Sequence, residues 1–92
     1  MAEYHFRKYF IPDRMMAGIK RYVEEGIEPG HFLQAVICND LAEAVSRADD
    51  ENLDNLAAYV VYFYNKVPSN LWGSKEKMDK WLTRCREHRD ET

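Results

Sequence analysis

Long apolar segments are missing from this chain of 92 residues. The longest apolar run is Leu56 to Val61, extended by further aromatics, whereas a membrane-spanning helix needs about 20 apolar residues. The amino terminus mixes charged and aromatic residues and has no apolar core of the kind found in signal peptides. We therefore expect no membrane contact, no signal peptide and a cytoplasmic protein.

Cysteine and catalytic motifs are also scarce. The two cysteines, Cys38 and Cys85, have no second cysteine or histidine at metal-ligand spacing. Both fall on apolar helical faces, so we interpret them as buried, reduced thiols. The chain has no nucleophile elbow, P-loop, HExxH or CxxC motif. We expect no metal, no cofactor and no enzymatic activity.

Basic residues are not in excess. The chain has 13 Lys and Arg against 16 Asp and Glu, a net charge of −3. Residues 31–65 carry one basic and six acidic side chains, and residues 66–92 carry seven basic and five acidic ones. Binding along a nucleic-acid backbone requires a coherent basic face. Direct nucleic-acid binding is therefore not expected.

The remaining sequence is patterned for helices. Apolar residues recur at helical spacing in four segments. The sequence thus predicts one all-α domain over residues 1–92, with helices at about 12–25, 30–48, 51–65 and 74–87. A core of this size gives modest stability, so we expect a marginally stable monomer or a homo-oligomer.

The second segment is predicted to be the central helix. Its first half, from Phe32 to Cys38, is apolar nearly all round, so other elements must cover it. Asp40 lies seven residues after Leu33 and three after Ile37, which places a carboxylate on the buried stripe. A buried carboxylate needs a partner. That partner is either a basic side chain of the protein itself or a group on a ligand or another protein.

Helix ends are well marked. Gly26 is placed for a left-handed cap that ends the first helix, and Ser74 caps the start of the last one. The turn at residues 28–30 predicts that the first two helices pack as an antiparallel hairpin. Glu3 to Phe10 reads as a short strand or, since no second strand is apparent, as an arm packed on the helices.

Two surfaces are candidates for contact with a protein partner. The acidic junction of Asp49, Asp50 and Glu51 precedes the third helix, whose rear face carries Tyr59 and Tyr62. That aromatic face is either covered by the amino-terminal arm or used at an interface. Trp72, on the loop before the last helix, is a further candidate. An aromatic residue on a loop either anchors an interface or fixes a helix crossing.

A second group of residues is typical of an anion site. Gly18 is unfavourable inside a helix, and it lies on one face with Arg14 and Arg21. The arrangement either admits a phosphate between two guanidinium groups or serves close helix packing. His31, at the start of the second helix, could join such a site or simply pack. A base would stack on Tyr22 or Trp72, and Asp40 completes this candidate set.

A set of short motifs lies between Pro12 and Ser74, over about two-thirds of the chain. They are Gly18-Ile19, Arg21-Tyr22, Pro29-Gly30-His31-Phe32-Leu33, Ala35-Val36, Asn39-Asp40-Leu41, Glu43-Ala44, Arg47-Ala48-Asp49, Asn52, Tyr64-Asn65, Pro68 and Trp72-Gly73-Ser74. With these motifs the stretch resembles small uncharacterised accessory proteins of tailed bacteriophages and prophages. Such proteins frequently bind host enzymes or defence components, or capture defence signals, so the resemblance implies a role of this kind.

Three functions are compatible with these observations. The first is a phage protein that binds a host protein and inhibits or redirects it, through the acidic junction or the aromatic face. The second is an oligomeric binder that captures a small phosphorylated molecule such as a nucleotide signal. The third is a structural or replication accessory protein of the phage, for which the sequence carries no specific signature.

Overall fold

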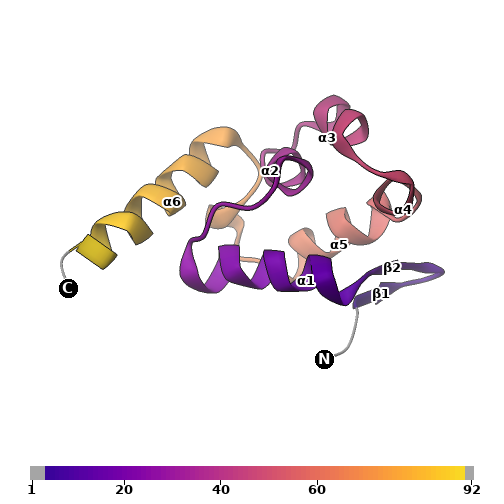
Figure 1. Ribbon diagram of the computed structural model, residues 1–92, viewed down its shortest axis with the longest axis horizontal. Coiled ribbons are helices and arrows are strands. Elements are labelled where there is room, and N and C mark those ends of the chain that lie inside the picture. The colour runs from indigo at the N-terminus through magenta and orange to yellow at the C-terminus, as the bar shows by residue number, and fades with distance from the viewer. Residues whose placement is uncertain (1–3, 91–92) are drawn as a thin grey trace.

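The computed structural model describes residues 4–90 and is mostly helical, as the sequence predicts (Figure 1). The four predicted helices are not observed as such, because the second and third are each broken in two. The elements, in chain order, are β1 Tyr4–Phe6, β2 Tyr9–Ile11, α1 Asp13–Lys20, the π-helical η1 Arg21–Glu25, α2 His31–Ile37, α3 Leu41–Arg47, α4 Asp50–Asp54, α5 Leu56–Lys66, the 3-10 turn η2 Ser69–Leu71 and α6 Lys75–Asp90.

The amino-terminal segment is an antiparallel hairpin that packs on α5. The sequence shows no second strand for this segment to pair with, but the segment itself supplies both strands. Tyr4 pairs with Ile11 and Phe6 pairs with Tyr9. The hairpin covers part of the aromatic face of α5, where the Tyr4 and Tyr62 rings meet edge to face at 4.9 Å between centroids. Of the two alternatives for this face, covering by the arm is the one observed.

The predicted helix over residues 30–48 is wrong at its middle. Asn39 adopts a left-handed conformation with φ of 60°, which asparagine tolerates better than most residues. Asp40 then accepts a hydrogen bond from the Glu43 amide at 3.2 Å and caps α3. Its carboxylate is exposed, so neither a buried ion pair nor a buried ligand contact is formed. The local capping preference outweighed the helical spacing.

The third predicted helix is interrupted at Asn55, which is buried. The Asn55 Nδ2 group donates to the Glu51 carbonyl at 2.9 Å, and its Oδ1 accepts from the Phe10 amide at 2.9 Å. One amide side chain thus satisfies backbone groups in α4 and in the hairpin. Helical spacing alone does not reveal this link.

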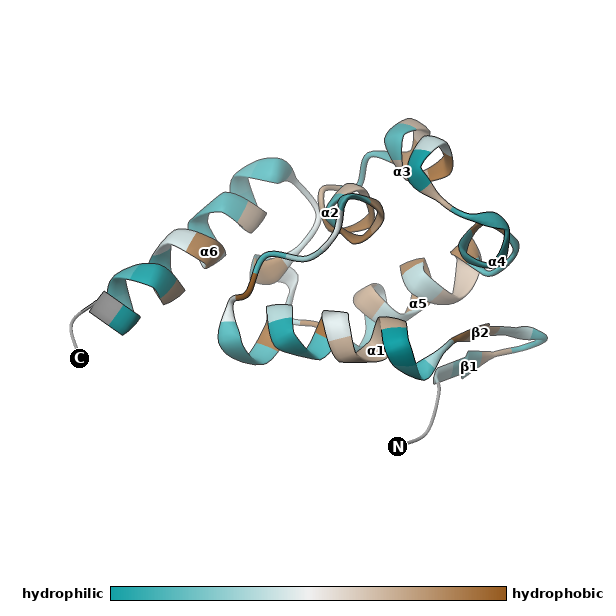
Figure 2. Ribbon diagram, viewed as in Figure 1, coloured by the Kyte–Doolittle hydropathy of each residue, from teal (hydrophilic) through white to brown (hydrophobic). Residues whose placement is uncertain are grey.

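The core surrounds α2, as predicted for the first half of the second segment. Five of its seven residues are buried, and α2 packs against α3, α5 and α6. In Figure 1, α2 is seen nearly along its axis while α1 lies across the page, so the predicted antiparallel hairpin of these helices is wrong. In Figure 2 the ribbons of α2 and α5 are coloured largely in the brown, apolar range, whereas α6 is largely teal.

Two predicted helix ends are confirmed. Gly26 is left-handed with φ of 67° and ends η1. Ser74 Oγ accepts from the Lys77 amide at 3.1 Å at the start of α6. Within residues 4–90, no helix is both long enough and apolar enough to cross a membrane.

Candidate functional sites

Four of the residues chosen for an anion site are brought together in one hollow of about 330 Å³ between α1 and the start of α2. We call this hollow the α1–α2 notch and define it by Arg14, Gly18, Arg21 and His31. A Cβ atom on residue 18 would come within 3.3 Å of the Leu33 side chain. Gly18 therefore allows close packing of α1 on α2, and the packing itself places the two arginines beside His31.

The charges of the notch are mixed. Arg14 donates to Glu51 and lies 3.9 Å from Asp49, and this hydrogen bond raises the pKa of the guanidinium. Among residues 4–90, the structure records no carboxylate paired with Arg21. Glu28 also lines the hollow. Arg21 and His31, both exposed, are consequently the groups available to an anion.

Two tyrosines assigned to binding are fully buried and cannot meet a partner. The Tyr22 hydroxyl donates to the Leu71 carbonyl at 2.7 Å, and the Tyr59 hydroxyl donates to Asn52 Oδ1 at 2.7 Å. Desolvation by burial raises the pKa of both hydroxyls well above that of a free tyrosine. Sequence spacing placed both rings on helical faces, but the chain that covers them is distant in sequence. They are structural residues.

Two of the three residues of the acidic junction make contacts that stabilise the fold. Asp49 caps α4 by accepting from the Asn52 amide at 2.8 Å, and Glu51 is engaged by Arg14. Asp50 is exposed, and no hydrogen bond or ion pair of its side chain is recorded within residues 4–90. Of the three predicted contact residues, Asp50 is therefore the one that can be changed without removing a cap or an ion pair.

Four apolar side chains on α3 and α5 are exposed. Their exposed fractions are 64%, 44%, 43% and 77% in chain order. Each pair on one helix is four residues apart and so shares a face, and one member of each pair, Leu41 or Val60, lines a common hollow. We call this surface the α3–α5 face and define it by Leu41, Val45, Val60 and Tyr64.

Trp72 borders the same surface. It is half-buried, its ring lies 5.8 Å from that of Phe63 between centroids, and it lines the hollow that Leu41 and Val60 share. The Trp72 ring thus packs on the core with one part and remains accessible with another. Its predicted role as an anchor for a partner and its role in fixing the loop are compatible.

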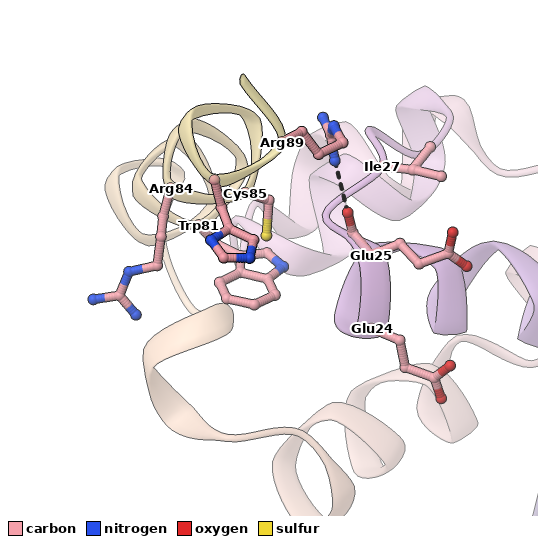
Figure 3. A pocket seen from close by; sticks show the side chains of 8 residues that line it. Glu24, Glu25, Ile27, Trp81, Arg84, Cys85 and Arg89 are labelled. Atoms are coloured by element: carbon pink, nitrogen blue, oxygen red, sulfur yellow. Dashed lines mark hydrogen bonds between the residues drawn. The ribbon is translucent and has the colours of Figure 1, made fainter. Parts of the chain in front are cut away.

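A third site was missed by the sequence reasoning. A groove of about 570 Å³ lies between η1 and α6 (Figure 3), and it is lined by Glu24, Glu25, Ile27, Trp81, Arg84, Cys85, His88 and Arg89. We call it the η1–α6 groove. The α6 members recur at positions 81, 84, 85 and 88, the spacing of one helical face. The sequence shows this spacing, but it does not show that η1 lies against this face of α6.

The remaining chemistry of the site residues is limited. Cys38 and Cys85 are free, half-buried thiols, and burial raises the pKa of Cys38. Within residues 4–90, no three His, Cys, Asp or Glu side chains are placed to hold a metal ion. No family model, curated protein or solved structure matches the chain.

Proposed function

We propose that this protein is a non-enzymatic accessory protein of a bacteriophage that binds a host protein in the bacterial cytoplasm and inhibits or redirects it. The α3–α5 face is the observation that carries the proposal. Exposed apolar side chains grouped on neighbouring helices are typical of sites that bind another protein. The resemblance to phage accessory proteins favours a host factor as the partner, with a component of host defence as the first candidate.

The charges around this face favour a basic partner. Residues 40–54 carry six carboxylates and one basic side chain, Arg47, which pairs with Glu43 at 2.7 Å. Asp40 lines the same hollow as Leu41 and Val60. An apolar patch bordered by Lys or Arg complements such a surface, whereas a second copy of this chain would bring further carboxylates to it. A heterologous partner is therefore favoured over self-association through this face.

Replacing the two most exposed members of the face tests the proposal. We expect Leu41→Lys/Tyr64→Lys to reduce capture of the host partner from a bacterial lysate by at least about tenfold, because two charges would enter an apolar contact. Capture is measured by quantitative mass spectrometry against immobilised wild type. Circular dichroism verifies that both proteins are folded.

The matched control is Ile27→Lys, which also places a charge at an exposed apolar residue, but outside the face. Asp50→Lys/Asp54→Lys tests the acidic border and leaves the cap at Asp49 intact. If wild type retains no host protein above background, or if the face variant retains the same proteins in the same amounts, binding through this face is ruled out.

A second candidate function rests on the α1–α2 notch. Arg21 and His31, the groups of the notch that are available to an anion, are of the kinds that bind phosphate in proteins, which favours capture of a small phosphorylated ligand such as a nucleotide by an oligomer of this chain. Tyr22 takes no part because it is buried. Native mass spectrometry of protein purified without denaturation would reveal both the oligomer and a retained ligand.

We expect Arg21→Gln to weaken nucleotide binding about tenfold, the usual loss for a charged hydrogen bond. Isothermal titration with a panel of nucleotides measures it, and Arg86→Gln, an exposed arginine outside the notch, is the control. Absence of heat and of thermal stabilisation at millimolar nucleotide would eliminate this candidate.

A further inference from the structure

Arg14 is shared between two parts of the molecule. It lines the α1–α2 notch together with Arg21 and His31, but its guanidinium donates to Glu51 on α4 and lies 3.9 Å from Asp49. The hydrogen bond to Glu51 is the largest cause of the raised pKa of this guanidinium. The charge of Arg14 is thus directed to the acidic junction, although its side chain borders the notch.

Arg21 is held differently. Its Nη2 atom lies 3.8 Å from the position that a Cβ atom on Gly18 would take, so its guanidinium lies over this glycine of the notch. Arg14 and Gly18 are four residues apart and share the same face of α1. The Arg14 side chain is 56% exposed, so little packing opposes its rotation. Rotation away from Glu51 would bring a second guanidinium to the notch.

The contact between Arg14 and Glu51 is of a kind that an anion can replace. Both side chains are about half exposed, at 56% and 43%, and ion pairs at such positions contribute little to stability. A phosphate group accepts paired hydrogen bonds from a guanidinium, and in the notch it would meet Arg21 as well. Glu28, which also lines the hollow, repels an anion and limits the affinity.

We propose that the contact of Arg14 with Glu51 is autoinhibitory, because it withholds one of the two arginines of the α1–α2 notch from a phosphate group. This inference rests on the second candidate function, capture of a phosphorylated ligand in the notch. In the restrained state the ligand meets Arg21 and His31, and in the released state it meets Arg14 as well. A basic partner that pairs with Glu51 would also release Arg14, so the partner and the anion would favour each other's binding.

Glu51→Gln tests this inference, because it removes the competing charge and leaves Arg14 in place. We expect this variant to bind inorganic phosphate and pyrophosphate about threefold to fivefold more tightly than wild type, as for release from an exposed ion pair. The gain is partial because Asp49 still attracts Arg14. Binding is followed by the amide chemical shifts of Gly18 and His31 in two-dimensional NMR. Ionic strength is held constant, since salt screens exposed charges.

Two controls separate the release of Arg14 from a general change of charge. Asp50→Asn removes the same charge one position away, at an exposed residue for which no ion pair is recorded within residues 4–90. It should change phosphate binding by less than about twofold, because screening weakens distant charges. In an Arg14→Gln background, Glu51→Gln should have no larger effect than Asp50→Asn, since the group that it releases is gone. Circular dichroism and urea unfolding verify that each variant is folded.

The outcomes distinguish this inference from the function on which it rests. Tighter binding by Glu51→Gln that disappears in the Arg14→Gln background supports the inference. If wild type shows no binding while Glu51→Gln binds, the autoinhibitory contact stands and capture by the unaided protein fails. Equal binding by wild type and Glu51→Gln overturns the inference and leaves the candidate function in place. A gain that persists without Arg14 also overturns the inference, and no binding by either protein at millimolar pyrophosphate overturns both.

Discussion

Replacing Gly26 with alanine should lower the free energy of unfolding by about 3 kcal/mol, since a left-handed conformation and overpacking each cost on the order of 1–3 kcal/mol. Gly26 has φ of 67°, and a Cβ atom there would lie 2.3 Å from the Cβ and 2.4 Å from the Sγ of Cys85. Both the turn and the crossing of α6 over η1 depend on the fact that residue 26 has no side chain. Urea unfolding followed by circular dichroism measures the loss.

Gly30→Ala is the matched control. Gly30 precedes α2 with φ of −67°, and no atom lies within 4 Å of the position that its Cβ would take. We expect a loss of less than about 1 kcal/mol there. Cys85→Ala should not rescue Gly26→Ala, because the clash with the Cβ of residue 85 remains. Equal stabilities of the two glycine variants would contradict the packing of α6 on Gly26.

The protein should also lose about 3 kcal/mol of stability between pH 9 and pH 11, because two buried tyrosines each contribute about 1.4 kcal/mol per pH unit above 10. Burial raises the pKa of Tyr22 and Tyr59 in the folded protein, while in the unfolded chain both titrate near pH 10. The folded state therefore holds protons that the unfolded state releases. The stability is fully present below pH 10 and falls as pH rises.

Urea unfolding at pH 9, 10 and 11 measures this dependence. Tyr22→Phe and Tyr59→Phe should each be less stable at pH 9, since one buried acceptor loses its donor, and each should lose about half of the pH dependence. Tyr64→Phe removes an exposed hydroxyl and should leave the slope unchanged. Half-buried Tyr62, whose pKa burial also raises, adds a smaller loss of the same sign. A stability independent of pH across this range would contradict the burial of the two rings.

Sequence patterns predicted those features that depend on neighbouring residues. The mostly helical content, the left-handed cap at Gly26 and the cap at Ser74 each involve contacts within a few positions, and all three are confirmed. The same local rules also account for the end of the second helix near Asn39, because Asn-Asp favours a left-handed residue followed by a cap. The prediction of an unbroken helix over residues 30–48 moved Asp40 from the surface to a predicted buried stripe.

Other features depend on segments that are distant in the chain. Helical spacing grouped Arg14, Gly18 and Arg21 on one face, but the crossing of α1 and α2 determines that His31 joins them. The hairpin determines that Tyr62 is partly covered, while Tyr64 stays exposed. The position of α6 turns one face of a polar helix into the wall of a groove.

The sequence by itself determined a helix-rich chain, the main capping residues, an acidic middle and the grouping of two arginines around Gly18. Only the tertiary structure decided which apolar residues remain exposed on the α3–α5 face, which tyrosines are buried, and where the notch and the groove lie. The physical reason is the sequence separation of the contacts involved. Capping and periodicity are set by backbone contacts within one or two turns, whereas burial and the juxtaposition of charges depend on which distant element packs against each face.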